Sequence, residues 1–254
     1  MNHEEKLDYL INYLLTEGGY RDETPSALPE KKRLLRALFN VRPPKPISAE
    51  FLRIQDEYLS EVLSKKQIAD AKTFSYRDGI AVWRGDITLL KADGIVNAAN
   101  SRLLGCFAPC HSCIDNAIHT YAGVQLRLEC DEIMKAQNFP EPTGQAKITG
   151  AYNLPSKYVL HTVGPIVFDG VTDKKRSELK SCYESCLALA DEKGLKSLAF
   201  CCISTGEFRF PNDEAAKIAV DTVRSYLRRT GSKIKVIFNV FKEIDNELYL
   251  KLLR

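Results

Sequence analysis

The chain has 254 residues, 44% of them hydrophobic and 27% charged, with a formal net charge of +3. This composition is ordinary for a globular protein, and no apolar run approaches the ~20 residues that a transmembrane helix needs, so we expect no membrane partner. The small positive charge does not predict a nucleic-acid-binding protein, although it is compatible with a small anionic ligand.

The first ten residues, MNHEEKLDYL, contain early acidic residues and lack the apolar core of a signal peptide. We therefore expect a cytoplasmic location. In that reducing compartment the eight cysteines of the chain are expected to be free thiols or metal ligands rather than disulfides.

Three helical patterns occupy the start of the chain. Apolar residues recur at helical spacing between Leu7 and Leu15, between Leu34 and Phe39, and between Phe51 and Val62. Prolines at positions 43, 44 and 46 separate the second pattern from the third, and Ser48 offers an N-cap for the third. We predict a helical N-terminal extension over residues 1–77 that acts as a buttress, a lid or a docking element, of which a buttress is the commonest.

From about residue 78 the pattern changes to short β-rich runs that alternate with helical patterns. The expected strands are Ile80–Trp83, Gly94–Ala98, Tyr158–Val163, Leu198–Ile203 and Val236–Val240. The expected helices are Ile114–Met134, Lys174–Glu192, Asn212–Leu227 and Ile244–Leu253. This alternation predicts an α/β domain over residues 78–254 with a mixed or largely parallel sheet.

Polar motifs lie at the ends of three expected strands. Gly85-Asp86-Ile87 follows the first, Asn97-Ala98-Ala99-Asn100 lies at the end of the second, and Ser204-Thr205-Gly206-Glu207-Phe208 follows the fourth. Because ligands of open α/β sheets bind outside the carboxyl ends of strands, we expect these loops to converge on one site. Asn side chains can donate to and accept from sugar hydroxyls, but they are also common loop caps.

The segment from Gly105 to His119, GCFAPCHSCIDNAIH, concentrates thiols and imidazole in eight residues. These residues are Cys106, Cys110, His111 and Cys113. Thiolate and imidazole are preferred zinc ligands; four protein ligands make a closed structural site, whereas three leave an open position, as in catalytic sites. Adjacent Cys110 and His111 can hardly both reach one ion without strain, which favours Cys110 as a bystander. A reduced, metal-free loop is the remaining alternative.

Five segments together resemble one family. They are GDIT at 85–88, NAAN at 97–100, IDNAIH at 114–119, TGQAKITGAYNLPSKYVLHTVGP at 143–165 and ISTGEF at 203–208. In this order and approximate spacing they resemble the macrodomain, the ADP-ribose-binding fold. The resemblance covers roughly residues 78–254 and implies a three-layer α/β/α fold with a mixed central sheet. The Cys/His loop replaces the family's usual glycine-rich loop, which resembles a zinc-dependent microbial branch that also carries an N-terminal helical extension.

The resemblance implies a catalytic end of the site. One Zn2+ ion would be held by Cys106, His111 and Cys113. Asp115 would reach the distal ribose and orient or deprotonate a water, and Asn100 would contact the same ribose. A carboxylate at this position is also favoured by the dipole of the helix that it begins, whatever its task.

The resemblance also implies a binding end. Asp86 would accept from the exocyclic amine of adenine while the backbone of Ile87 donates to the ring. The backbone of the later loop would wrap the diphosphate at a helix N-terminus, where Gly206 allows close approach and Phe208 stacks on a ribose. The residues of that loop are Ser204, Thr205, Gly206, Glu207 and Phe208.

Members of the zinc-dependent branch remove ADP-ribose from mono-ADP-ribosylated proteins, so the resemblance implies a hydrolase with these proteins as substrates and ADP-ribose as ligand. It also implies, as in some microbes, a link with a sirtuin-like ADP-ribosyltransferase and lipoate-carrier proteins. Two alternatives stay open. In the first alternative the chain is a module that reads ADP-ribose without cutting it. In the second it is an interaction protein whose zinc loop is a structural staple.

Overall fold

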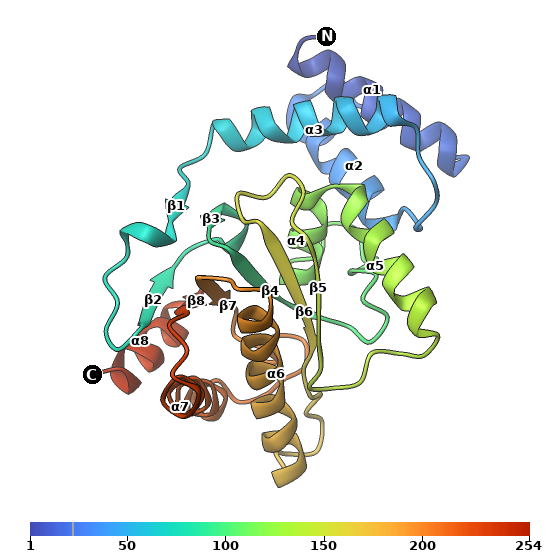
Figure 1. Ribbon diagram of the computed structural model, residues 1–254. Helices are drawn as coiled ribbons and strands as arrows, with labels where there is room; N and C mark the ends of the chain where they lie inside the picture. The colour runs from blue at the N-terminus through green and yellow to red at the C-terminus, as the bar shows by residue number, and fades with distance from the viewer. Residues whose placement is uncertain (22) are drawn as a thin grey trace.

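Three helices form the N-terminal extension of the computed structural model, which describes residues 1–21 and 23–254 (Figure 1). They are α1 (His3–Gly18), α2 (Leu28–Val41) and α3 (Ala49–Ser64). Ser48 caps α3 by accepting from the Phe51 amide, as expected from the sequence. The apolar faces of the helices form a core of their own, which one residue of the later domain, Val124, joins. The predicted N-terminal helices are therefore present.

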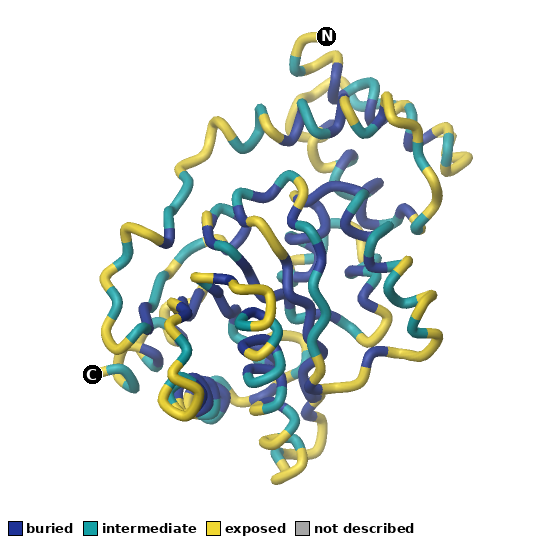
Figure 2. Tube along the Cα trace, viewed as in Figure 1, coloured by how far each residue is buried: buried dark blue, intermediate teal, exposed yellow. Residues whose placement is uncertain are grey.

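The chain then builds a six-stranded mixed sheet in the order β2-β8-β7-β4-β6-β5. The strands are β2 (Ile80–Arg84), β4 (Gly94–Ala99), β5 (Ala146–Gly150), β6 (Tyr158–Val163), β7 (Ser197–Phe200) and β8 (Lys235–Val240). Neighbouring strands pair in parallel, except that β5 runs antiparallel to β6 at one edge. The inner strands are buried along almost their whole length (Figure 2), as expected when helices cover both faces.

Five helices flank this sheet. They are α4 (Ile114–Ala122), α5 (Val124–Gln137), α6 (Asp173–Glu192), α7 (Asn212–Thr230) and α8 (Glu243–Leu252). His161 of β6 faces Cys130 of α5, and the next residue of the strand, Thr162, faces Cys182 of α6. Because successive side chains of a strand point to opposite faces, α5 and α6 cover opposite sides of the sheet. The predicted three-layer α/β/α fold is confirmed.

Two short strands connect the extension to the sheet domain. β1 (Ala69–Asp70) pairs in parallel with β3 (Leu90–Lys91), and the 3-10 turns η1 (Ala71–Thr73) and η2 (Ile87–Leu89) lie beside them. Ala71 already belongs to the core of the sheet domain. The domain boundary between residues 77 and 78 stays a prediction. None of the helices in the described part of the chain has the length and apolar content to cross a membrane.

The structure corrects two predicted elements. The prediction of a single helix over Ile114–Met134 was wrong, because Gly123, with a φ of 92°, lies between α4 and α5 and separates them. A side chain at this glycine would have its Cβ 2.6 Å from Nε2 of Gln55, so the break also makes room for α3. The strand expected over Leu198–Ile203 ends at Phe200, and its last three residues begin a loop. Strand β5 was not predicted.

Candidate functional site

The carboxyl ends of four parallel strands form the edge that the sequence predicted as a binding site. Asp86 follows β2, Phe241 follows β8, the loop over residues 201–211 follows β7, and Asn100 follows β4. From β2 to β4 there are three interstrand spacings, about 14 Å in all. The edge therefore suits an elongated ligand that crosses the strands, with chemically different groups at its two ends.

At the β4 end, two asparagines hold one carboxylate. Asn97 Nδ2 donates to Asp115 Oδ1 at 2.8 Å, and Asn100 Nδ2 donates to Oδ2 at 3.2 Å. Asn100 also donates to the carbonyl of Gly105 at 3.0 Å and so ties the start of the Cys/His loop to the strand end. The structure thus brings together Asn100 and Asp115, the two residues predicted to be catalytic.

Burial sets the protonation of this cluster. Asp115 is only 5% exposed, and its burial raises its pKa to about 6, against the opposing effect of the two amide hydrogen bonds and of Arg127. Beneath it, burial lowers the pKa of His161 to about 4 and, together with Arg127 and His161, lowers that of His119 well below its usual value. A carboxylate close to neutral imidazoles at pH 7 is a competent proton acceptor.

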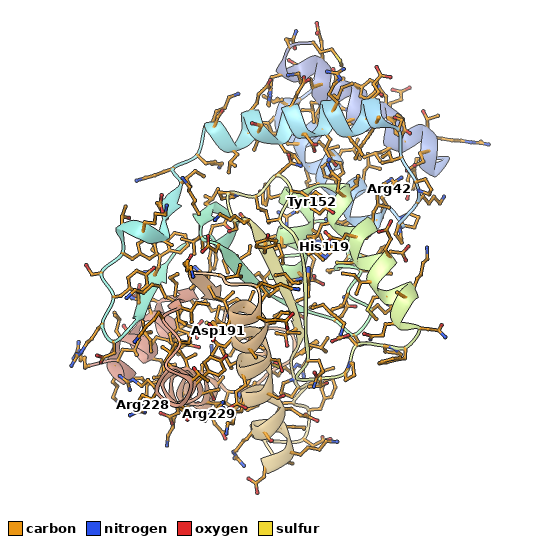
Figure 3. The ribbon with its side chains drawn as sticks, in the orientation of Figure 1. Arg42, His119, Tyr152, Asp191, Arg228 and Arg229 are labelled. Carbon is orange, nitrogen blue, oxygen red and sulfur yellow. The ribbon has the colours of Figure 1, made fainter. Side chains whose placement is uncertain are left out.

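The two histidines complete a buried polar layer under the site. His119 Nε2 lies 3.5 Å from Asp115 Oδ1, while His161 contacts Asn97 and Thr149. Figure 3 shows His119 in the region where the extension meets α4 and α5. Ligand atoms of His119, Cys130 and His161 lie within 4.8 Å of one another. These contacts hold His161 in place within the sheet.

The Cys/His loop gathers three potential metal ligands beside Asp115. Ligand atoms of Cys106, His111 and Cys113 all lie within 4.8 Å of one another. Nδ1 of His111 is buried and has no hydrogen-bond partner among the described residues. Two thiols and an imidazole nitrogen without a competing partner fit one tetrahedral zinc ion.

Cys110 is turned away from these three residues. Its φ of 53° lies in the left-handed region, which a non-glycine residue adopts only when other contacts hold it there. Its thiol donates to the carbonyl of Arg33 in α2 at 3.4 Å. The three-ligand arrangement therefore leaves the third thiol of the loop, that of Cys110, on the side of the extension.

The loop after β7 presents backbone and hydroxyl donors in the middle of the edge. Ser204 has a φ of 65° and is 5% exposed, and its hydroxyl finds no partner in the described chain. A Cβ added at Gly206 would meet no atom within 4 Å, so the surface there is open to a ligand. The helix α7 begins at Asn212, directly beyond this loop. An open backbone surface close to a helix N-terminus suits an anion.

The two loops face each other at the β4 end. His111 Nε2 lies 3.7 Å from Oε1 of Glu207, whose side chain is 70% exposed. The structure thus brings the Cys/His loop close to the loop over residues 201–211, the candidate anion-binding loop. Phe208 lies next to this contact, and its carbonyl accepts from the Val167 amide at 2.8 Å.

Asp86 and Ile87 mark the opposite end of the edge. Asp86 is exposed and caps η2, since its Oδ1 accepts from the amide of Thr88 at 3.0 Å and from its hydroxyl at 2.7 Å. Its Oδ2 remains an acceptor for a ligand. The turn is fixed to β8 by Asn239, whose Nδ2 donates to the Gly85 carbonyl at 2.9 Å.

Sequence reasoning missed two parts of this site. Phe241 is 76% exposed at the end of β8, the strand between Asp86 and the anion-binding loop, and offers a ring face to a base. An exposed aromatic residue after a buried strand was the available signal. Arg36 and Asn40 of α2 bond to the Cys/His loop, and no local sequence pattern predicts such distant contacts.

Comparison with known proteins agrees with this geometry. The family model described as Macro domain matches residues 96–219. A protein-ADP-ribose hydrolase of Treponema medium is 55% identical over 260 aligned positions, which cover 100% of both chains. The chain belongs to the macrodomain family.

Two further macrodomain relatives bear on the ligand and on partners. A Trypanosoma brucei macrodomain, solved in complex with ADP-ribose, is 31% identical with a TM-score of 0.67, and the match covers 86% of this chain and 95% of that one. A probable bifunctional ADP-ribose hydrolase/ADP-ribosyltransferase of Fusarium oxysporum f. sp. cubense is 43% identical over 88% of this chain. The match covers 41% of that longer protein.

Proposed function

We propose that this macrodomain is a zinc-dependent hydrolase that removes mono-ADP-ribose from modified proteins. The observation that carries the proposal is the meeting of two groups at the β4 end of the binding edge. The potential ligands Cys106, His111 and Cys113 lie beside the carboxylate that Asn97 and Asn100 hold. The relative named protein-ADP-ribose hydrolase supports the reaction, and the trypanosome macrodomain in complex with ADP-ribose supports the ligand.

ADP-ribose fits the order of groups along the edge. Adenine lies at the β2 end, where Asp86 accepts from its amine, the Ile87 amide donates to its ring, and Phe241 stacks on its face. The diphosphate lies against the loop over residues 204–208. The distal ribose then reaches Asn100 and Asp115. Contacts far from the reacting bond supply binding energy that positions the sugar.

The chemistry takes place at the anomeric carbon of the distal ribose. A zinc ion bound by Cys106, His111 and Cys113 supplies a Lewis acid at this end of the site. Asp115 accepts a proton from the attacking water, whose oxygen bonds to the anomeric carbon as the bond from that carbon to the protein breaks. The departing protein group takes up a proton. Asn97 and Asn100 hold the carboxylate in place through their amide donors.

An enzyme that adds the modification is the partner that this reaction requires. The fused hydrolase/ADP-ribosyltransferase name of the Fusarium relative supports such a pairing. The sirtuin-like ADP-ribosyltransferase and the lipoate-carrier protein implied by the resemblance stay part of this proposal. A cytoplasmic location, expected from the sequence, belongs to it as well.

Release of ADP-ribose from a mono-ADP-ribosylated protein tests the proposal. The wild type is expected to release ADP-ribose, to lose this activity when a chelator removes its metal, and to regain it with one equivalent of zinc. Circular dichroism of the chelated protein checks that it stays folded. Tight binding of ADP-ribose without release by the zinc-loaded protein would instead support the reader module, and undiminished release by folded, metal-free protein would contradict the zinc role.

A further inference from the structure

The helix α2 of the extension bonds directly to the loop that carries the potential metal ligands. Arg36 Nη2 donates to the carbonyl of His111 at 2.8 Å and to Oδ1 of Asn116 at 2.8 Å. The amide of Asn116 in turn donates to Sγ of Cys113 at 3.4 Å, and its Nδ2 donates to the Ala108 carbonyl at 3.0 Å. The guanidinium of Arg36 thus contacts His111 directly and Cys113 through Asn116.

A second contact of α2 holds the cysteine that is not a ligand. Asn40 is fully buried; its Oδ1 accepts from the Cys110 amide at 2.8 Å, and its Nδ2 donates to Thr120 Oγ1 at 2.9 Å. Together with the bond from the Cys110 thiol to the Arg33 carbonyl, this fixes the left-handed backbone of Cys110. The thiol of Cys110 is therefore held on the α2 side.

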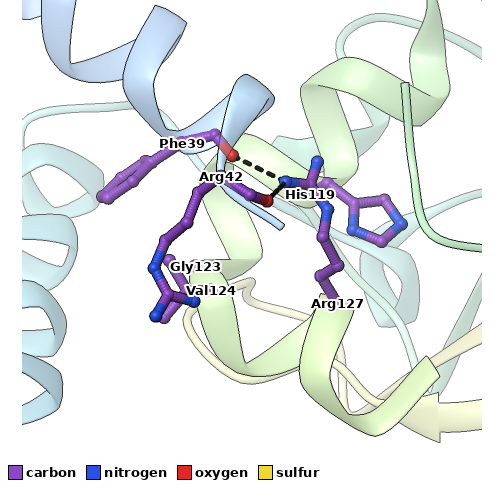
Figure 4. A pocket seen from close by; sticks show the side chains of 6 residues that line it. All are labelled: Phe39, Arg42, His119, Gly123, Val124 and Arg127. Carbon is purple, nitrogen blue, oxygen red and sulfur yellow. Dashed lines mark hydrogen bonds between the residues drawn. The ribbon is translucent and has the colours of Figure 1, made fainter. Parts of the chain in front are cut away.

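Arg127 of α5 joins the end of α2 to the start of the Cys/His loop. Arg127 of α5 donates to the carbonyls of Phe39 at 2.9 Å and Arg42 at 2.5 Å, and its Nε donates to the Leu104 carbonyl at 2.6 Å. Figure 4 shows its guanidinium directed at the two α2 carbonyls, with His119 beside it. These carbonyls lack intrahelical partners because they end a helix, so a buried cation satisfies them well. The ring of Phe107 lies 4.3 Å from the guanidinium carbon.

We infer that α2 is a positioning element of the metal site, which fixes His111 and Cys113 as ligands and keeps Cys110 away from the ion. The inference rests on the proposed zinc role. It gives the extension a task beyond that of a buttress, because an ion with three protein ligands keeps one position for reacting groups, whereas a fourth ligand, here the thiolate of Cys110, closes it. Arg36 and Asn40 act through the loop and do not touch the substrate.

Cobalt titration of the full chain tests this inference, since cobalt absorbs visible light and its thiolate charge-transfer band grows with each sulfur ligand. Arg36→Gln removes the bond to the His111 carbonyl and is expected to weaken metal affinity by about 10- to 100-fold. Arg36→Lys keeps the charge but not the two-pronged geometry, so it should restore only part of the affinity. Arg53→Gln, an exposed arginine of α3 paired with Glu57, is the matched control and should bind cobalt as the wild type does.

Asn40→Ala tests the hold on Cys110. Releasing that residue is expected to raise the thiolate band by about half, from two sulfur ligands to three, and Cys110→Ala in the same chain should return the band to the wild-type intensity. ADP-ribose affinity of the metal-free proteins, measured by calorimetry, should stay within about twofold in all variants, because the adenine and diphosphate contacts lie elsewhere. If Asn40→Ala does not fold, the cobalt affinities of Arg36→Gln and Arg36→Lys test the inference by themselves.

The outcomes separate the inference from the proposed function. Wild-type protein that binds no stoichiometric cobalt or zinc would contradict the proposed function itself. Wild-type binding with unchanged affinity in Arg36→Gln and an unchanged band in Asn40→Ala would overturn only the role of α2. A loss of metal affinity that matches a loss of ADP-ribose affinity and of melting temperature would reduce that role to general stability, which also overturns the inference.

Discussion

The two loops on either side of the sugar end are held in place in different ways. The anion-binding loop is held mostly by its own backbone, since the Phe210 amide donates to Ser204 at 2.9 Å and the Arg209 amide donates to Gly206 at 3.0 Å. The Cys/His loop is held from outside, by Arg36 and Asn40 of a helix that precedes it by about 70 residues. One loop is self-contained, and the other depends on the extension.

This difference indicates that the two loops can be perturbed separately. The self-contained loop follows β7, in the part of the molecule that is proposed to bind the nucleotide. The Cys/His loop is tied to β4 at its start by Asn100, and its later part is held by Arg36 and Asn40 of α2. Substitutions should therefore separate ADP-ribose affinity from metal affinity and turnover.

Cys113→Ala is expected to have the largest effect. It removes one of the three proposed ligands and should lower ADP-ribose release by about 1,000-fold or more, since a metal Lewis acid supplies several kcal/mol of transition-state stabilisation. Metal content measured by mass spectrometry should fall in parallel, while calorimetry shows ADP-ribose binding close to wild type. Cys110→Ala is the matched control, and a loss of release as large as that of Cys113→Ala would contradict the three-ligand arrangement.

Asp115→Ala should reduce turnover by about 100- to 1,000-fold, the usual loss on removal of a general base. Because Asp115 is not among the three ligands, the variant should retain its zinc. Single-turnover kinetics at saturating substrate separates the effect on the chemical step from any effect on binding. Loss of zinc from this variant, with normal release after the metal is restored, would argue that the carboxylate acts on the metal rather than on a water.

Gly206→Val tests the self-contained loop. A Cβ added at this position meets no protein atom within 4 Å, so the fold is expected to tolerate the valine, which would block the surface that the diphosphate is proposed to approach. ADP-ribose affinity should fall by about 30-fold, in line with the loss of a charge-assisted hydrogen bond or two. Cobalt affinity should not change. An affinity for ADP-ribose equal to wild type would show that the ligand does not cross this loop.

Phe241→Ala is expected to have the smallest of these effects, a 5- to 10-fold loss of ADP-ribose affinity, which corresponds to the lower range of base–aromatic stacking. Phe139→Ala is the control, because Phe139 is also exposed, at 57%, but follows α5 instead of a sheet strand. The measurement is calorimetric titration with ADP-ribose and with ribose phosphate. A similar loss for both ligands would contradict a contact with adenine.

Much of this site was accessible from the sequence because it depends on local rules. Asp86, Asn100 and Ser204 follow apolar runs of strand length, and parallel strands bring their carboxyl ends to one edge. The burial of the inner strands and the alternation with helices then led to the layered fold. The family resemblance implied Cys106, His111 and Cys113 as a set of ligands, and their ligand atoms lie within 4.8 Å of one another.

The remaining features depend on contacts between distant segments. The break at Gly123 was missed because the apolar pattern runs through it, whereas the φ of 92° and the approach of Gln55 from α3 both favour a glycine there. The bonds of Arg36 and Asn40 to the loop join residues 70 to 80 positions apart and follow no periodicity. β5 is an antiparallel edge strand of intermediate burial, so it lacks the continuous apolar run of the inner strands.

X-ray absorption at the zinc edge, with and without ADP-ribose, tests the central claim most directly. The claim is that three residues of the Cys/His loop hold the ion and leave one position for reacting groups. The spectrum should fit two sulfur atoms and two lighter atoms, and addition of ADP-ribose should change the contribution of the lighter atoms. A shell of three sulfur atoms and one nitrogen that is the same with and without ADP-ribose would contradict the account.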